Sequence, residues 1–233
     1  MSVILSATSC LNWLGRMLKR PAAELVAELG PERRPASSLL FLPYLDGCWS
    51  PQDDADVRGA FIGLDHGACD ATLTQAVMQG VVFAMAEAAA GFHENGAVFD
   101  QLLAIGGGSK SRVWLAMLAD SLNVPIAIPA ASELGAAFGA ARLGLVASTG
   151  ARPAEIFTRP PIVEVIEPDP GRAACYAEVF AHWRALYAPV RAASAALSFH
   201  ADRVALPARH SSAAALPLNG GQPADAGHAS AAI

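Results

Sequence analysis

The sequence predicts an α/β fold with a parallel sheet, because short apolar runs of strand length alternate with longer runs of helical periodicity. The alternation is clearest between residues 102 and 145, where strand, helix, strand and helix follow one another. A turn that contains three glycines joins the first of these strands to its helix. Of the 233 residues, 53% are apolar, which is enough for the core of one large domain or two small ones.

The elements before this series are two helices, two short strands and a loop. Residues 2–18 have apolar positions at roughly helical spacing and predict a helix. Residues 21–35 predict a second helix and then a linker, because glycine and proline interrupt the pattern. The short segment 39–45 predicts a buried strand, the turn-forming and acidic composition of 46–58 predicts an exposed loop, and the alternation of small and apolar residues over 59–64 predicts a short strand.

A long helix is predicted to follow the second short strand. Asp70 or Thr72 can cap a long helix that runs to about Phe92. The alternating series then gives strand 102–105, helix 111–122, strand 125–128 and helix 132–145, and a last helix with an aromatic face covers 173–193. The helix over 132–145 carries a run of glycine and alanine, and such small side chains predict close packing against the sheet or a neighbouring helix.

Composition and charge argue against several classes of protein. A net charge of −5 and a pI near 5.6 give no basic surface for nucleic acid. The four cysteines form no Cys-x-x-Cys pair, which argues against a zinc site. The first twenty residues place their positive charges after the apolar stretch, which is the wrong order for a secretory signal. The most apolar window, 76–92, contains Gln79 and Glu87, which argues against an uninterrupted membrane-spanning segment. We therefore expect a cytoplasmic protein that binds neither nucleic acid nor membrane.

The candidate functional segment is the turn from Ile105 to Ser111, Ile-Gly-Gly-Gly-Ser-Lys-Ser. Its glycines allow backbone N–H groups to approach a phosphate, and Ser109 or Ser111 can cap the following helix. The same turn can also serve packing alone, and the residues leave both interpretations open. The spacing matches neither Gly-x-x-x-x-Gly-Lys-Ser/Thr nor the dinucleotide fingerprint. A dinucleotide-binding module is further disfavoured, because a small-residue helix follows in place of an acidic strand end.

Three stretches together resemble the carboxy-terminal half of the FGGY family of carbohydrate kinases, most closely its xylulokinase members. They are MSVILSATSCLNW over 1–13, FLPYLDG with a following Gly-x-Phe-x-Gly-Leu over 41–64, and IGGGSKSRVWLAMLAD with ELGAAFGAARLG over 105–142. The resemblance implies an actin-like ATPase domain built on an RNase H-like sheet. We expect this domain to cover residues 1–198, with 1–38 as a helical lead-in and linker, and to be incomplete at its amino-terminal end. Residues 199–233 are of low complexity and are expected to be disordered.

The resemblance also implies a chemistry, because members of the family move the γ-phosphate of ATP onto a sugar hydroxyl. ATP lies between two domains, and Mg²⁺ accompanies it. Carried over to this chain, the glycine turn is an adenosine-binding segment. The nucleotide-binding residues implied in this way are Gly106, Gly107, Gly108, Ser109 and Ser111. The sugar implied is D-xylulose or a related ketose.

Other parts of the pattern depart from the family or lie outside it. Residues 47–51 read Gly-Cys-Trp-Ser-Pro where relatives commonly have Gly-Glu-Arg-Thr-Pro. The family's catalytic Asp belongs to a segment before Met1, so the resemblance assigns no catalytic or metal-binding residue here. Without the strands that precede Met1 in the family, the remaining strands are expected to expose an edge and an apolar face. Four acidic residues in one loop are interpreted as surface charge: Asp46, Asp53, Asp54 and Asp56. Asp120, at the end of a predicted helix, is interpreted as a structural contact.

Two hypotheses for the function follow. In the first, the chain supplies the adenosine side of a sugar kinase site that an upstream domain completes. In the second, the chain is a truncated, non-catalytic fragment that at most binds nucleotide or a partner. An intact upstream reading frame would support the first hypothesis, and saturable ATP binding that persists without any sugar would favour the second.

Overall fold

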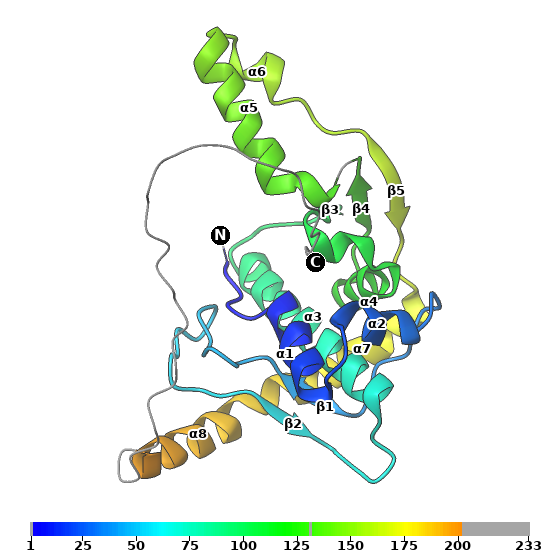
Figure 1. Ribbon diagram of the computed structural model, residues 1–233, viewed down its shortest axis with the longest axis vertical. Helices are drawn as coiled ribbons and strands as arrows, with labels where there is room; N and C mark the ends of the chain where they lie inside the picture. The colour runs from blue at the N-terminus through cyan, green and yellow to red at the C-terminus, as the bar shows by residue number, and fades with distance from the viewer. Residues whose placement is uncertain (1, 131, 202–233) are drawn as a thin grey trace, which may run out of the picture.

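The computed structural model describes residues 2–130 and 132–201, which form a helical body, a small sheet and a helical arm that projects from the sheet (Figure 1). The expected tail over 199–233 lies outside the described residues, except for the last three residues of the final helix. The elements in chain order are α1 (Thr8–Leu18), α2 (Ala22–Glu28), β1 (Leu40–Leu42), β2 (Ala60–Ile62), α3 (Asp70–Glu94), β3 (Leu102–Leu103), the 3₁₀ turn η1 (Gly107–Lys110), α4 (Arg112–Leu122), β4 (Ile126–Pro129), the 3₁₀ turn η2 (Ser132–Leu134), α5 (Gly135–Thr149), α6 (Pro153–Ile156), β5 (Ile162–Ile166), α7 (Pro170–Ala185) and α8 (Tyr187–Ala201).

The body is built around α3, whose side chains are buried on all sides from Thr74 to Ala84. β1 and the helices α1, α2, α4 and α7 contact it. By length and composition α3 would also qualify as a membrane-crossing helix, and 72% of its apolar window is buried inside the protein. A core helix passes the same test, and the contacts of α3 are those of a core helix.

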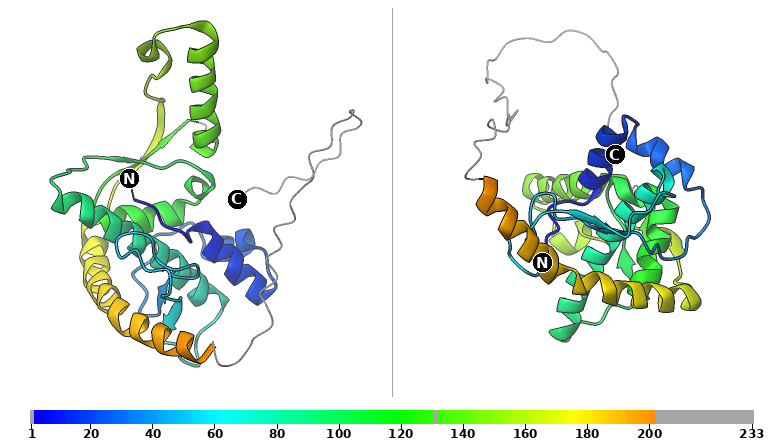
Figure 2. Two further views of the ribbon diagram at one scale, coloured as in Figure 1. Left: turned by 90° about the vertical axis from the view of Figure 1, so that its left-hand side faces the viewer. Right: turned by 90° about the horizontal axis from the view of Figure 1, so that it is seen from below.

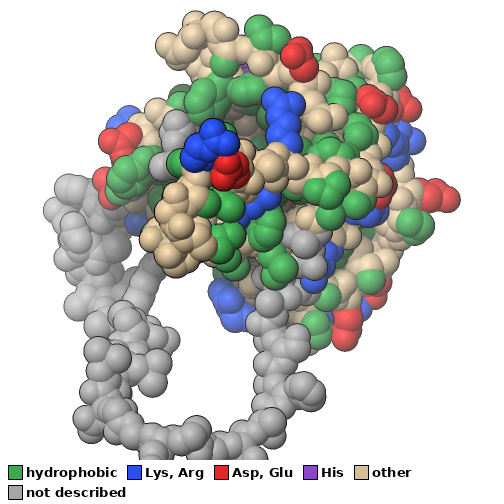
Figure 3. All heavy atoms as spheres, turned by 90° about the horizontal axis from the view of Figure 1, so that it is seen from above, with side chains coloured by type: hydrophobic (Ala, Val, Ile, Leu, Met, Phe, Trp, Pro, Cys, Tyr) green, Lys and Arg blue, Asp and Glu red, His purple; other side chains and the backbone are tan. Residues whose placement is uncertain are grey.

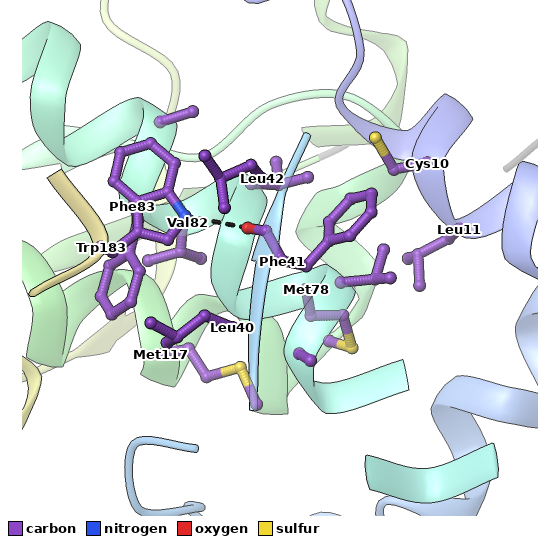
Figure 4. Packing of buried hydrophobic residues seen from close by; sticks show 14 of the residues in the cluster. Cys10, Leu11, Leu40, Phe41, Leu42, Met78, Val82, Phe83, Met117 and Trp183 are labelled. Atoms are coloured by element: carbon purple, nitrogen blue, oxygen red, sulfur yellow. Dashed lines mark hydrogen bonds between the residues drawn. The ribbon is translucent and has the colours of Figure 1, made fainter. Parts of the chain in front are cut away.

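Aromatic side chains of α7 pack against β1 and α3 (Figure 4). The Trp183 indole is 1% exposed, and its Nε1 donates a hydrogen bond of 2.8 Å to the Phe41 carbonyl of β1. The rings of Phe83 and Phe180 lie 5.8 Å and 6.1 Å from it, centroid to centroid. This cluster therefore connects β1, α3 and α7.

The sheet near the glycine turn is mixed. β3 and β4 are parallel, with Leu102 opposite Ile126, as the alternating pattern predicts. β5, which was not predicted, is antiparallel to β4, so the sheet as a whole is mixed. α4 packs on the sheet through apolar contacts. β1 and β2 form a separate antiparallel pair with Phe41 opposite Phe61.

Two predicted helices have different bounds in the structure. The first begins at Thr8, because residues 5–7 form a bend and Ser6 bonds to a distant loop: Ser6 Oγ donates to Asp46 Oδ2 over 2.8 Å. The last is two helices. α7 begins at Pro170, where the Asp169 carboxylate accepts the N–H of Arg172 over 3.0 Å, and it ends before Leu186.

The helix with the run of small residues, α5, does not pack as predicted. None of its residues is buried, and with α6 it forms an arm, residues 135–156, that leads away from the body (Figure 2). Its small side chains therefore face mainly solvent. Only at its base does a glycine meet a close neighbour: a Cβ on Gly135 would lie 2.9 Å from Cβ of Ile105.

Apolar side chains are exposed over the sheet and the arm, and green side chains are spread over the face seen from above (Figure 3). Among the described strands β3 forms an edge of its sheet, and Leu103 is 52% exposed. This agrees with the expected exposed edge and apolar face. Further exposed apolar residues are Ile105, Phe138, Leu143, Leu145, Phe157, Ile162, Val163 and Val165.

The loop over 46–58 is less exposed than predicted, and the interpretation of Asp54 as surface charge was wrong. The Asp54 side chain is 11% exposed. Its Oδ2 accepts hydrogen bonds from the Tyr187 hydroxyl (2.9 Å) and from Arg191 Nε (2.7 Å), both on α8. Its Oδ1 accepts the N–H groups of Asp56 and Val57. Asp54 therefore joins the loop to α8.

These contacts predict an acid-sensitive link between the loop and α8. Burial raises the pKa of Asp54, but the hydrogen bonds from Asp56, Tyr187, Arg191 and Val57 outweigh burial and lower this pKa to about 2. A carboxylate with a lowered pKa stabilises the folded state above the ordinary carboxyl range, and the stabilisation is lost as the pH falls towards the folded pKa. We expect stability to fall between about pH 4 and about pH 2.

The corresponding variant is Asp54→Asn, which we expect to lower the free energy of unfolding by about 1 to 2 kcal/mol at neutral pH. The difference from the wild type should shrink as the pH falls towards 2, because the wild-type carboxylate becomes protonated. Urea unfolding across this pH range measures both effects. Asp53→Asn, one residue earlier, is the control, and a parallel pH dependence for Asp54→Asn and the wild type would contradict the assignment.

Candidate functional site

The glycine turn begins where the chain leaves the sheet after β3. The Ala104 N–H still bonds to the Ala127 carbonyl over 2.9 Å, and Gly106 then adopts a positive φ of 89°. A side chain is strained at such a φ, so glycine is the residue that suits this position. The residues that follow form η1, and α4 starts directly after it.

The two serines of the turn have different roles. Ser111 is the N-cap of α4, and its Oγ accepts the N–H of Trp114 over 3.3 Å, so one of the two predicted caps is confirmed. Ser109 is buried and does not cap the helix. Its Oγ donates to the Gly106 carbonyl over 2.7 Å and lies 2.7 Å from Ser132 Oγ. Ser109 therefore holds the turn from the inside.

Two cavities lie on either side of the turn. The larger, of about 440 Å³, opens between the turn, the start of α1, α3 and α4, and the smaller, of about 270 Å³, opens between the turn, α1 and α2. Gly107, Gly108 and Trp114 line both. Ser109 lines the larger cavity and Ser111 the smaller one, so all the predicted nucleotide-binding residues border this space; the larger cavity is otherwise walled mainly by Val82, Met85, Leu103, Leu115 and Leu118.

Polar residues from α1 and η1 also reach the cavities, and the sequence analysis assigned them no role. Thr8 of α1 lines both cavities, and Asn12 of α1 and Lys110 of η1 line the smaller one. Thr8 and Asn12 belong to the first of the three stretches that carry the family resemblance. That stretch was the signal for their place at the site, because residues 1–13 and 105–142 are far apart in the chain and meet here.

The walls of the cavities suit binding more than proton transfer. Among their lining residues there is no aspartate, glutamate or histidine. No group of three or more His, Cys, Asp or Glu side chains within residues 2–130 and 132–201 is arranged to hold a metal ion. What the site offers is apolar surface, backbone groups of a glycine turn, hydroxyls and one lysine.

Asp120, near the end of α4, has the structural role predicted for it. Its Oδ1 accepts a hydrogen bond from Arg33 Nη1 over 2.6 Å and from the Asp169 N–H over 2.8 Å. Burial raises the pKa of Asp120, and the Asp169 N–H and the Arg33 charge act in the opposite direction. Asp120 thus joins the linker after α2 to the start of α7 and does not line either cavity.

Comparison with known proteins identifies the family. Residues 3–148 match the model of the FGGY family of carbohydrate kinases, C-terminal domain. Xylulose kinase from Escherichia coli K12 is 34% identical over 191 residues, which cover 80% of this chain and 39% of that protein. Xylulose kinase from Klebsiella pneumoniae is 35% identical over 188 residues, 78% of this chain and 38% of that protein.

Solved structures give the same result. A xyloylose kinase from Brucella ovis superposes with a TM-score of 0.76 at 44% identity, over 82% of this chain and 40% of that chain. A ligand-bound xylulose kinase from Lactobacillus acidophilus superposes with a TM-score of 0.67 at 27% identity, over 82% and 39%. The chain spans about two fifths of the length of these relatives. It belongs to the FGGY family of carbohydrate kinases and has the actin-like ATPase fold of that family's C-terminal domain.

Proposed function

We propose that this chain supplies the adenosine-binding side of an ATP-dependent sugar kinase site. The nucleotide would lie against Gly106, Gly107, Gly108, Ser109 and Ser111. The observation that carries the proposal is the glycine turn bordered by a cavity on each side, one of about 440 Å³ and one of about 270 Å³. The larger cavity is of the size that small-molecule sites have, and a turn at the start of a helix suits an anionic ligand.

The chemistry of the walls fits a nucleotide. The larger cavity is mostly apolar, which suits the faces of a purine ring, and Trp114 lies between the two cavities. Lys110 and Ser111 on the other side of the turn provide a cation and a hydroxyl, which suit phosphate oxygens. The residues of this chain would therefore bind and orient the nucleotide.

The proposed reaction is transfer of a phosphoryl group from ATP to a hydroxyl of D-xylulose or a related ketose, in the cytoplasm. The xylulose kinases among the relatives support this choice of sugar. When bound, ATP supplies the phosphoryl group and Mg²⁺ neutralises its charge. The described residues around the turn do not fit a Mg²⁺ site. We further propose that the carboxy-terminal kinase domain extends over residues 1–198.

Titration of the full chain with ATP tests the nucleotide site, and Gly106→Ala is the informative variant. Alanine at a φ of 89° is strained even though no atom lies within 4 Å of its Cβ, so the turn is expected to shift. We expect ATP to bind the variant about tenfold more weakly, or worse, by isothermal titration calorimetry. Failure of the wild type to bind ATP would overturn the proposed function.

Gly96→Ala is the matched control. Gly96 also has a positive φ, of 83°, and no atom lies within 4 Å of its Cβ, but it follows α3 and lines neither cavity. It should therefore carry the same backbone strain and leave ATP affinity unchanged. An equal loss of affinity in both variants would mean that strain alone, and not the turn, weakens binding. Saturable ATP binding without phosphate transfer to D-xylulose would leave a nucleotide-binding role without catalysis.

A further inference from the structure

We propose that Ser132 is a positioning residue for the nucleotide-binding turn and that it acts through Ser109. This inference rests on the proposed function, because the turn that Ser132 holds is the one proposed to bind ATP. Ser132 begins η2, after β4, and lies 23 residues beyond Ser109 in the chain. It lines neither cavity, so its effect on a nucleotide must pass through the turn.

The hydrogen bonds around Ser132 form a closed set. The Ser132 carbonyl accepts the Gly106 N–H over 2.7 Å. Ser109 Oγ donates to the Gly106 carbonyl over 2.7 Å, and its distance to Ser132 Oγ is also 2.7 Å. A hydroxyl carries a single hydrogen, and that of Ser109 is used on Gly106. Ser132 Oγ is therefore the donor in the contact between the two serines.

This assignment gives a chain of donors that ends on the backbone of the turn. Ser132 Oγ–H points to Ser109 Oγ, and Ser109 Oγ–H points to the Gly106 carbonyl. Each bond in such a chain polarises the next. Both serine side chains are buried, 3% exposed at Ser109 and 8% at Ser132, so water does not readily replace either partner.

The result is that both polar groups of Gly106 are held by the two serines. The Gly106 N–H bonds to Ser132, and its carbonyl bonds to Ser109, which Ser132 orients. Gly106 is also the residue whose positive φ turns the chain away from β3. Between two open cavities, the turn needs such fixed contacts to present its backbone in one conformation before a ligand arrives.

A contact of a different kind supports the same place in the fold. Ile105 packs against the backbone of Gly135, where a Cβ would lie 2.9 Å from Cβ of Ile105. Ile105 precedes Gly106, and Gly135 follows η2. The two segments are therefore in contact through backbone, hydroxyl and apolar groups at once.

The experiment measures ATP affinity of the full chain together with amide hydrogen exchange of residues 105–109 in the absence of ligand. Ser132→Ala should bind ATP about threefold to tenfold more weakly, the factor that one hydrogen bond is worth, with faster exchange at the turn. Ser109→Ala should behave in the same way. The double variant should bind ATP no more weakly than either single variant, because both substitutions break the same chain of hydrogen bonds. Ser132→Thr keeps the hydroxyl and should restore affinity.

Ser148→Ala is the matched control, because Ser148 lies at the far end of α5 and its Oγ donates only to the Leu145 carbonyl in the described structure. It should change neither affinity nor exchange. Equal affinity and unchanged exchange in Ser132→Ala would overturn the positioning role, as would a loss of global stability without a change in affinity. If the wild type binds no ATP, the proposed function fails, and the exchange data alone decide: unchanged exchange overturns the role of Ser132 in holding the turn, and faster exchange supports it.

Discussion

Gly80→Ala is expected to lower the free energy of unfolding by about 2 kcal/mol or more. Gly80 lies where α3 crosses β1, and a Cβ there would be 2.3 Å from the Phe41 carbonyl oxygen. Such a contact cannot exist, so the helix and the strand would have to separate. The strand has little room to move, because the Phe41 carbonyl is also bonded to Trp183 and Phe41 pairs with Phe61 in β2.

Gly91→Ala provides the control in the same helix. No atom lies within 4 Å of a Cβ on Gly91, so alanine is accommodated there. Alanine is favoured over glycine inside a helix by up to about 1 kcal/mol, and Gly91→Ala should stabilise the protein or leave it unchanged. Urea unfolding measures both variants. Equal effects of the two substitutions would show that α3 and β1 do not approach as closely as described.

Trp183→Ala is expected to lower the free energy of unfolding by about 4 kcal/mol, the middle of the range for a large buried aromatic side chain. The substitution leaves a cavity beside Phe83, Phe180 and Tyr44. It also leaves the Phe41 carbonyl without its indole donor, and an unpaired buried carbonyl carries a further cost.

Trp49→Ala is the matched control, because the Trp49 side chain is 59% exposed in the loop over 46–58. It should change the free energy of unfolding by less than about 1 kcal/mol. Trp183→Phe separates the two contributions, because phenylalanine keeps most of the apolar contact and removes only the N–H. If Trp183→Ala were no more harmful than Trp49→Ala, the placement of α7 against β1 would be wrong.

The elements that were predicted correctly are those whose pattern is local. α3 shows this best, because its apolar run and its length are contained in one segment. The predicted cap at Asp70 or Thr72 was one to three residues late: the N-cap is Cys69, and Thr72 Oγ1 accepts the Cys69 N–H over 2.9 Å. β5 was missed because its residues Ile162–Ile166 are mostly exposed and pair with β4 across the whole arm. The early start predicted for α1 was wrong because Ser6 bonds to Asp46, forty residues away.

The candidate site divides in the same way. The glycine turn and its cap at Ser111 were readable, because a strand, three glycines and a helix are consecutive in the sequence. The contact of Ser109 with Ser132 was not readable, because it depends on how β4 returns the chain to the turn. The small residues of α5 predicted close packing, but composition alone does not say which surface covers a helix, and in the described structure none does.

The arm has a mechanical consequence that follows from its length. α5 contains 15 residues, so at a rise of about 1.5 Å per residue it is about 22 Å long. The base of α5 lies against the turn and its far end lies away from the body. A rotation of α5 by about 10° about its base would therefore displace its far end by about 4 Å. A distance measured from a probe near residue 148 would therefore change by more than the atoms around Gly106 move when the turn rearranges.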